Sequence, residues 1–383
     1  MAQVDAASVR LAEDGDLLRL GTWLRDRGLD PGKAAAVSQA AMARIRAQDR
    51  WDRSDRLLFT KEGLEQASDP DVSRWRARRF DSASMVVDVG AGLGGDTIAI
   101  AEVAEQVVAV DIDESRLVLL RHNASQFDVH PDLVCGDAAS LPVVVPGLLH
   151  ADPSRRLGGR RLRRLADYHP SMPALGPWLR QAAGGAIVVS PGVRLDDPDL
   201  PQGELEFVQV GRDLVEAVVW TGELSGGARR SATVLSGGAA HHIAHDGGER
   251  LAVADVGEWL LEPAVAAVRA RLHDHLGAEV GAWRIARNRA LLTADHDPGT
   301  SPWWRAGRVE AVLPLRAKAL RAWLAEGRTG PIEFVLHGVD LDVDEFWRAV
   351  GSPARDWGGR VAHLVRLDAG AACVVTAVPA GGA

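Results

Sequence analysis

The stretch from Val86 to Asp137 constrains the fold of this chain more than any other part of it. Three short apolar runs follow one another there, and they lead to three aspartates, Asp88, Asp111 and Asp137. Helix-forming segments separate the runs, and this alternation is typical of a parallel α/β sheet. Because parallel strands end at the same edge of a sheet, we expect the three carboxylates to line one nucleoside-binding crevice.

A glycine-rich turn follows the first run. Gly90, Gly92 and Gly94 fit a G-x-G-x-G loop, whereas Gly90, Gly92 and Gly95 fit the G-x-G-x-x-G dinucleotide fingerprint. Glycine lets the backbone adopt positive φ and approach a ligand closely. Asp111 lies about 20 residues further on, where it could hold a ribose in either case.

Two acids favour one kind of adenosine cofactor. Asp88 stands where a dehydrogenase strand would usually carry an apolar residue, and it suits a ligand with a cationic amino-acid group. Asp137 is placed to accept a hydrogen bond from the exocyclic amine of an adenine. The alternative is a chance glycine turn beside unrelated acids, and we favour the cofactor site.

Length and composition limit the number of modules, the cellular compartment and the association with membranes that we expect. With 383 residues the chain is long enough for two or three modules. Cys135 and Cys373 provide neither a disulfide framework nor a metal cluster, and they suit a reducing compartment. No apolar run reaches the ~20 residues of a membrane span, and no signal-peptide core is evident, so we expect a cytoplasmic protein without a membrane partner.

The formal net charge also bears on possible partners. A net charge of −8 argues against non-specific binding of nucleic acid over the whole surface, but it does not exclude a local basic groove.

We expect the chain to be divided into four parts. They are an N-terminal helical region (1–78), an α/β domain (79–222), a connector with a helical segment (223–304) and a small α+β domain (305–383). Strands are expected at Val86–Gly90, Val107–Asp111, Asp132–Gly136, Leu148–Asp152 and Ala186–Ser190. An antiparallel hairpin, Leu205–Val210 with Leu214–Thr221, would end this sheet.

The sequence signals for secondary structure are weaker in residues 223–383. Residues 223–255 are rich in Gly and Ser, which favours a connector, and Glu258–His275 is expected to be helical. In the last part we expect a helix around Leu320, a strand at Ile332–Leu336, and a short helix with a capping box at Asp342 and Glu345. Two paired strands, Val361–Leu367 and Ala372–Val378, would complete a unit with one shared core.

The acids and glycines after Val86 resemble those of class I S-adenosylmethionine-dependent methyltransferases. The resemblance covers roughly residues 81–222. It implies a Rossmann-like, seven-stranded sheet that ends in an antiparallel hairpin. It also implies S-adenosylmethionine as the cofactor.

This resemblance implies a role for each matching residue. Asp111 would take both ribose hydroxyls, with Ile112 beside the adenine. Asp137 would bind the adenine amine, with Ala138 near the ring. The residues implied under the methionine portion of the cofactor are Asp88, Gly90, Gly92 and Gly94.

A narrower resemblance is to the bacterial THUMP-like-domain methyltransferases, akin to trimethylguanosine-synthase-type RNA methyltransferases. It rests on the segment 58–67, on Asp152-Pro153 and on the C-terminal unit. In that family the Phe59–Thr60 segment lies across the methionine end of the cofactor, so Thr60 is a candidate ligand. Its alternative role is a helix N-cap. The accessory domain of THUMP-type enzymes binds structured RNA, which implies an RNA partner.

Asp152 and Pro153 follow the fourth expected strand, where such enzymes contact the acceptor. Amino-methylating relatives often carry an acid or Asn, two prolines and an aromatic there. The acid and a backbone carbonyl accept hydrogen bonds from the target amine, and the aromatic stacks on the base. Here Ser154 and Arg155 replace the second proline and the aromatic, although an arginine plane can also stack on a base.

Six arginines occur within ten residues after Pro153, interrupted by Gly158-Gly159. One interpretation is a loop that contacts phosphates beside the active site. The alternative is a solvated helix start that pairs with surface acids. The candidate substrate-binding residues are Arg155, Arg156, Arg160 and Arg161.

The leading hypothesis is therefore an S-adenosylmethionine-dependent methyltransferase that acts on RNA, at a base nitrogen, by in-line methyl transfer. The alternative is a non-catalytic RNA-binding protein that keeps the methyltransferase fold. A methyltransferase of proteins or small molecules and a dinucleotide-dependent oxidoreductase are further alternatives. No metal is expected: His241-His242, with His245 and Asp246 nearby, lacks a neighbouring cysteine and lies in a glycine-rich setting.

Overall fold

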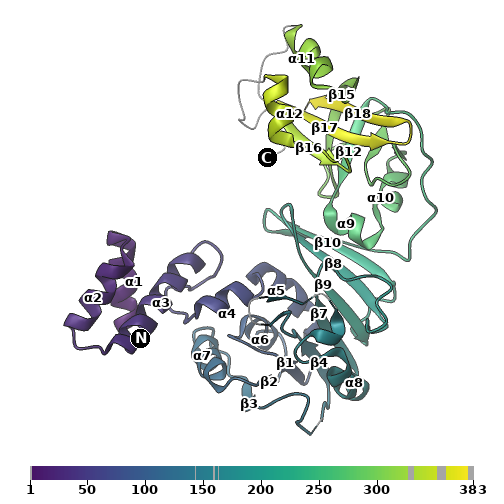
Figure 1. The fold of residues 1–383 in the computed structure, drawn as a ribbon. Coiled ribbons are helices and arrows are strands. Elements are labelled where there is room, and N and C mark those ends of the chain that lie inside the picture. The colour runs from purple at the N-terminus through teal and green to yellow at the C-terminus, as the bar shows by residue number, and fades with distance from the viewer. Residues whose placement is uncertain are drawn as a thin grey trace. The chain divides into compact units, whose positions relative to one another are not determined.

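The computed structural model describes residues 2–142, 144–157, 160–162, 164–326, 332–351 and 359–377, with only the backbone described at Leu157 and Arg161. The chain forms two compact units (Figure 1). The first comprises Met1–Leu205 and Glu216–Gly227, and the second comprises Glu206–Val215 and Ala228–Ala383. The four-part division expected from the sequence remains a prediction beside these two units.

The first unit begins with helices, as the sequence predicts. They are α1 (Ala2–Asp14), α2 (Leu17–Asp26), α3 (Pro31–Ala47), α4 (Lys61–Gln66), α5 (Pro70–Ala77) and the 3-10 turn η1 (Arg78–Phe80). Their starts follow from local chemistry. Asp16, Asp30 and Asp69 accept hydrogen bonds from backbone amides of the first turns. Pro31 and Pro70 occupy the first helical position, where the missing N–H costs nothing.

A parallel sheet forms the centre of the first unit. Its strands are β1 (Val86–Val89), β2 (Val107–Asp111), β3 (Asp132–Cys135), β4 (Leu148–Ala151) and β7 (Gly184–Val189), in the order β7-β4-β1-β2-β3. The helices between them are α6 (Gly95–Ala101), α7 (Glu114–Ser125) and α8 (Met172–Gln181). The α/β architecture and these strands are confirmed, whereas the sheet to which they belong has nine strands among the described residues and not the expected seven.

The sheet pairs with an antiparallel strand beside β7. This strand is β9 (Asp213–Gly222), which pairs with β7 from Gly184↔Gly222 to Val189↔Ala217. It follows β8 (Glu204–Val210), so both strands of the expected hairpin are present. The boundary between the two units falls inside this hairpin.

The expected connector proves to be structured. In the second unit β10 (Arg230–Ser236) and β11 (Ala239–Ala244) form an antiparallel hairpin. Gly237 and Gly238 make the turn, both at positive φ, as a two-residue hairpin of this kind requires. The sequence does contain a signal for this hairpin, namely a Gly-Gly pair between two apolar runs. The Gly- and Ser-rich composition of the segment instead led to the prediction of a connector.

The expected helix Glu258–His275 is wrong over its first part. Instead β12 (Trp259–Pro263) pairs with both β14 (Leu292–Ala294) and β15 (Trp304–Pro314). Two helices, α9 (Val265–Ala270) and α10 (His273–Glu279), and the short strand β13 (Trp283–Arg284) complete the segment. Leu260 and Leu261 are both buried, and a strand buried on both faces has the continuous apolar run that also suits a helix.

The rest of the second unit agrees with the expected element order. It comprises α11 (Ala317–Ala325), β16 (Ile332–His337), α12 (Val343–Val350), β17 (Arg360–Leu367) and β18 (Gly370–Ala377). The strands join a sheet of order β13-β14-β12-β15-β18-β17-β16. Leu320 and Phe346 of the two helices pack against Leu364 and Cys373 in one core. Asp342 caps α12 by accepting a hydrogen bond from the amide of Glu345, as predicted, and Val378 lies outside the described residues.

Candidate active site

The loop between β1 and α6 takes a conformation that requires glycine. Gly90, Gly92 and Gly94 have φ angles of +84°, +57° and +93°, whereas Gly95 is the first residue of α6 and is absent from the positive-φ residues. The G-x-G-x-G pattern therefore describes the loop better than the dinucleotide fingerprint. A Cβ at Gly90 would lie 2.8 Å from the carbonyl oxygen of Asp152, so the loop passes directly beside the end of β4.

Asp111 ends β2 and is tied to the glycine loop. Its Oδ2 accepts a hydrogen bond from the amide of Gly92 at 2.8 Å, and its Oδ1 accepts one from the amide of Asp113 at 2.9 Å. Each carboxylate oxygen has a further lone pair, so the oriented group can still accept bonds from a ligand. The next side chain, Ile112, is 69% exposed and offers an apolar surface beside this carboxylate.

Asp137 and Ala138 lie in a short turn after β3, which pairs in parallel with β2. The carboxylate of Asp137 is exposed and accepts a hydrogen bond from the amide of Ala139 at 2.9 Å. The buried Ala138 is fixed through its carbonyl, which accepts a bond from Nε1 of Trp178 at 3.0 Å. The turn thus brings both residues to the carboxyl edge of the sheet, on the strand next to Asp111.

Asp88 lies beneath the loop. One carboxylate oxygen accepts a bond from the hydroxyl of Thr97, and the other lies 2.7 Å from Nδ1 of His150. The residue is only 1% exposed. Its expected contact with a cationic group of the ligand remains a prediction.

Thr60 is the N-cap of α4. Its hydroxyl oxygen accepts a hydrogen bond from the amide of Gly63 at 2.9 Å, so the N-cap alternative is confirmed and a ligand role remains a prediction. The segment nevertheless lies against the glycine loop. Phe59 shares a core cluster with Leu93 of the loop, and a Cβ at Gly63 would overlap the Leu93 side chain.

Asp152 follows β4 and is half-buried, and Pro153 after it is buried. The amide of Asp152 donates to the carbonyl of Val89 at 3.1 Å. Burial raises the pKa of the Asp152 carboxyl, and the nearby Arg155 guanidinium opposes that rise. Nη1 of Arg155 donates to the carbonyl of Val189 at 3.3 Å, so Arg155 lies at the carboxyl end of β7. The structure therefore brings Asp152 and Arg155 together beside the loop.

The arginine-rich segment forms a small ribbon, and the helix start considered from the sequence is not what the structure shows. Strands β5 (Arg156–Leu157) and β6 (Arg160–Arg161) pair antiparallel. Arg156 and Arg160 of this ribbon are both exposed. Gly158, Gly159 and Arg163 lie outside the described residues.

A buried polar network behind the loop was missed from the sequence. Nε2 of His150 lies 3.1 Å from Nη1 of Arg76, whose Nη2 donates to both carboxylate oxygens of Glu216 at 2.7 Å. Arg76 also forms an ion pair with Asp96 at 2.6 Å. Although burial opposes ionisation, the Arg76 guanidinium holds the pKa of Asp96 at about 2. A histidine inside the apolar run Leu148–Ala151 was the available signal, because polar residues buried in strands need partners.

The histidines considered for a metal have other contacts. Nδ1 of His242 lies 2.9 Å from the hydroxyl of Thr233, and the ring of His245 stacks on that of His275. Among the described residues, no group of three or more His, Cys, Asp or Glu is arranged to hold a metal ion. None of the described helices is long and apolar enough to cross a membrane.

Two family models match parts of the chain. A model described as RNA cap guanine-N2 methyltransferase matches residues 83–156, which include the glycine loop, Asp111 and Asp152. A model described as THUMP domain-like matches residues 305–377, from β15 to β18.

Whole-chain relatives agree with the first of these models. Proteins of two Mycobacterium tuberculosis strains, CDC 1551 and H37Rv, are 34% identical over 327 residues, covering 84% of this chain and 87% of the relative. Each is named an uncharacterized S-adenosylmethionine-dependent methyltransferase. Over only 97 residues the chain is 35% identical to ribosomal RNA small subunit methyltransferase A of Rhodopseudomonas palustris, covering 24% of this chain and 30% of the relative.

The fold has a solved counterpart as well. A crystal structure from Porphyromonas gingivalis W83, whose description proposes a methyltransferase, superposes with a TM-score of 0.74 at 18% identity, covering 96% of this chain and 99% of that one. The parallel sheet, its glycine loop and its strand-end carboxylates define an α/β enzyme of the class I methyltransferase type. The chain belongs to the S-adenosylmethionine-dependent methyltransferases. S-adenosylmethionine is accordingly its cofactor.

Proposed function

We propose that this methyltransferase acts on RNA and that the acceptor is an amino nitrogen of a base. The observation that carries the proposal is the position of Asp152. Asp152 is half-buried and its backbone carbonyl lies beside the glycine loop, its carboxyl is near Arg155, and two exposed arginines, Arg156 and Arg160, follow on the ribbon β5–β6. A hydrogen-bond acceptor, a planar cation and a basic strip together suit a base with its flanking phosphates.

The residues present fit the cofactor. The loop glycines at positive φ leave room for close backbone approach, and the Asp111 carboxylate is oriented by two backbone amides with acceptor capacity to spare. We propose that Asp111 binds the ribose, with Ile112 and Ala138 beside the adenine and Asp137 at its amine. Gly90, Gly92, Gly94 and Thr60 would border the methionine portion. When bound, S-adenosylmethionine supplies an electrophilic methyl group on a sulfonium.

On the acceptor side, the role of the protein is to orient the target amine. The Asp152 carboxylate and the carbonyl of Pro153 would accept hydrogen bonds from the target amine and direct its lone pair. Holding two reactants in attack geometry can lower a barrier by ~7–11 kcal/mol in favourable cases, without a strong base. Arg155 would stack on the base, in the place where relatives carry an aromatic.

RNA as the substrate is supported by three further points. Arg156 and Arg160, which are exposed, would contact phosphates, and we propose the same role for Arg161 from the sequence. The matching family models describe an RNA cap methyltransferase and a THUMP-like domain. One relative is named a ribosomal RNA methyltransferase. We also place the protein in the cytoplasm, since its two cysteines are free.

The test is methyl transfer combined with binding. Calorimetry should show micromolar binding of S-adenosylhomocysteine, lost in Asp111→Ala, with NADH as the comparator that does not bind. Labelled S-adenosylmethionine should then transfer methyl groups to total RNA. Asp152→Ala should abolish that transfer while it keeps cofactor affinity. Transfer to a protein fraction instead of RNA would overturn the proposed substrate.

A further inference from the structure

The carboxylate of Asp88 connects the two ends of the glycine loop. Asp88 precedes the loop on β1, and Thr97 follows it in the first turn of α6, where its hydroxyl donates to Oδ2 of Asp88. The other oxygen, Oδ1, is held by Nδ1 of His150 at 2.7 Å. The orientation of Asp88 across the loop therefore depends on His150.

His150 is itself oriented from its other side. Its Nε2 lies 3.1 Å from Nη1 of Arg76, and a guanidinium can only donate. Nε2 must then be the acceptor, which leaves the ring proton on Nδ1, where it is donated to Asp88. Arg76 is fixed in turn by Glu216 of β9 and by Asp96 in the first turn of α6.

Burying this polar network costs free energy, which argues that the network has a function beyond stabilising the fold. His150 is 0% exposed and Arg76 is 1% exposed, so their polar atoms have been removed from water. Replacing buried ionic groups with apolar residues is often neutral or stabilising, and the best-supported use of such groups is to specify one arrangement. The arrangement specified here is that of the loop and of the first turn of α6.

We propose that His150 is a positioning residue for the cofactor: it fixes Asp88, and through Asp88 the glycine loop, while Arg76 selects its tautomer. The inference rests on the proposed cofactor site but does not require RNA as the acceptor. It predicts that the bond from Nδ1 to Asp88 governs cofactor affinity more than the interaction with Arg76 does.

Two substitutions separate these bonds. In His150→Asn the side-chain amide occupies the place of Nδ1 and can donate to Asp88, but it does not reach Arg76. In His150→Gln the amide reaches the place of Nε2 and Arg76, but it provides no donor to Asp88. A hydrogen bond to a charged group contributes ~1.5–3 kcal/mol, so we expect the Gln variant to bind S-adenosylhomocysteine about tenfold more weakly or worse. The Asn variant should remain within about threefold of the wild type.

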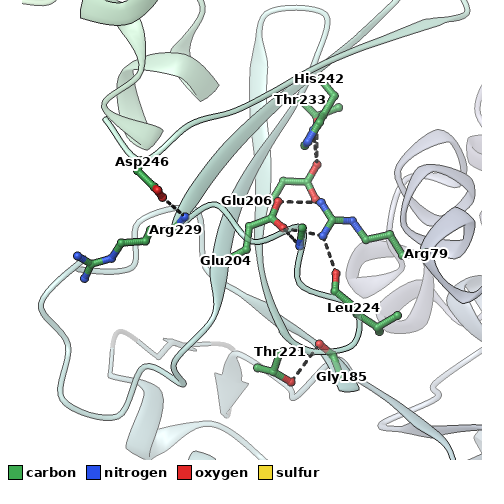
Figure 2. Close-up of polar contacts among 11 residues, drawn as sticks. Arg79, Gly185, Glu204, Glu206, Thr221, Leu224, Arg229, Thr233, His242 and Asp246 are labelled. Carbon is green, nitrogen blue, oxygen red and sulfur yellow. Dashed lines mark hydrogen bonds and ion pairs between the residues drawn. The ribbon is translucent and has the colours of Figure 1, made fainter. Parts of the chain in front are cut away.

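A matched control comes from a second ion pair of the first unit. Arg79 donates to both carboxylate oxygens of the buried Glu204 and to the carbonyl of Leu224, and none of these residues belongs to the glycine loop (Figure 2). Glu204→Gln should lower the melting temperature and leave the affinity for S-adenosylhomocysteine unchanged. This variant measures how far a general loss of stability alone affects binding.

The outcomes are distinct. Weak binding by the Gln variant with near-normal binding by the Asn variant supports the proposal. Equal affinities of both, or a weakening in all three variants that follows their melting temperatures, would overturn it. Should the Gln variant not fold, Asp88→Asn must show the loss of affinity instead. A wild type that binds S-adenosylhomocysteine yet methylates no RNA would overturn only the proposed substrate.

Discussion

Gly90 and the carbonyl of Asp152 are in such close proximity that a Cβ at position 90 would lie 2.8 Å from that oxygen. The two residues follow β1 and β4, which are neighbours in the parallel sheet. The glycine loop and the acid that we propose for the acceptor side therefore lie directly against each other. Any displacement of one backbone is transmitted to the other, because protein interiors are close-packed.

Gly90→Ala should weaken both stability and cofactor binding. The substitution adds a Cβ at a φ of +84° and against a backbone atom that cannot rotate away. Unfavourable backbone conformations of this kind cost about 1–3 kcal/mol. Gly28→Ala is the matched control, since its φ is +86° but its Cβ would meet nothing within 4 Å. Thermal unfolding should show reduced stability in both variants, whereas calorimetry with S-adenosylhomocysteine should show weaker binding only in Gly90→Ala.

Methyl transfer should have an acid limb that reports Asp152. Burial raises the pKa of this carboxyl, Asp96 adds to the rise, and the Arg155 and Arg76 guanidinium groups oppose it. The ionised carboxylate accepts a stronger hydrogen bond from the target amine than the protonated carboxyl does, so kcat/KM should increase as the pH rises through this pKa. Arg155→Ala removes a cation that lowers the pKa and should move the acid limb to higher pH.

The control for that shift is Arg156→Ala, because Arg156 is exposed and is not among the groups that perturb Asp152. An acid limb that moves equally in both variants, or in neither, would contradict the assignment of the limb to Asp152. The measurement is the pH profile of kcat/KM with saturating S-adenosylmethionine.

The ribbon arginines should affect RNA binding through salt dependence. For each phosphate that the protein no longer neutralises, the slope of log K against log salt should become shallower by about 0.7–0.9. We expect Arg156→Ala and Arg160→Ala to lower affinity for all RNA sequences alike, with additive effects on the slope. Arg19→Ala removes an exposed arginine of α2 and should change nothing. Fluorescence anisotropy across a salt series would show an unchanged slope if the ribbon does not touch RNA.

Asp96 should make folding sensitive to strong acid. Its pKa of about 2 lies below the ordinary 3.8, so its contribution is complete above pH 3.8 and is lost as the pH falls through about 2. Linkage converts this shift to a contribution of about 2 kcal/mol. Asp96→Asn should therefore be less stable than the wild type at neutral pH, with a difference that narrows below pH 4.

Urea unfolding between pH 2 and 7 would measure that difference. Asp55→Asn is the control, because Asp55 is exposed and its ion pair with Arg56 is long, at 3.8 Å. Such surface pairs contribute ~0–1 kcal/mol, so its difference from the wild type should be small throughout. A constant gap for Asp96→Asn across the whole pH range would show that ionisation of Asp96 is not what stabilises the fold.

The sequence predicted the glycine loop and the acids at the strand ends because the signals for them are local. A glycine that must take positive φ, an apolar run of strand length and an acid at its end are each visible within a few residues, as at Gly90 and Asp111. The prediction failed where the same local pattern suits both a helix and a strand, as in the helix expected at Glu258–His275. Leu260 and Leu261 suit a buried strand as well as a helix, and only the pairing of β12 with β14 and β15 decides between them.

The sequence by itself thus determined the α/β alternation, the glycine loop and the acids that end its strands. The tertiary structure alone decided what lies behind them: Arg76 and Glu216 are 140 residues apart in the chain, yet their side chains meet at 2.7 Å. The physical reason is that a buried charge is tolerated only where partners from other elements satisfy it. Those partners are chosen by the packing of the helices on the sheet, which no window of the sequence contains.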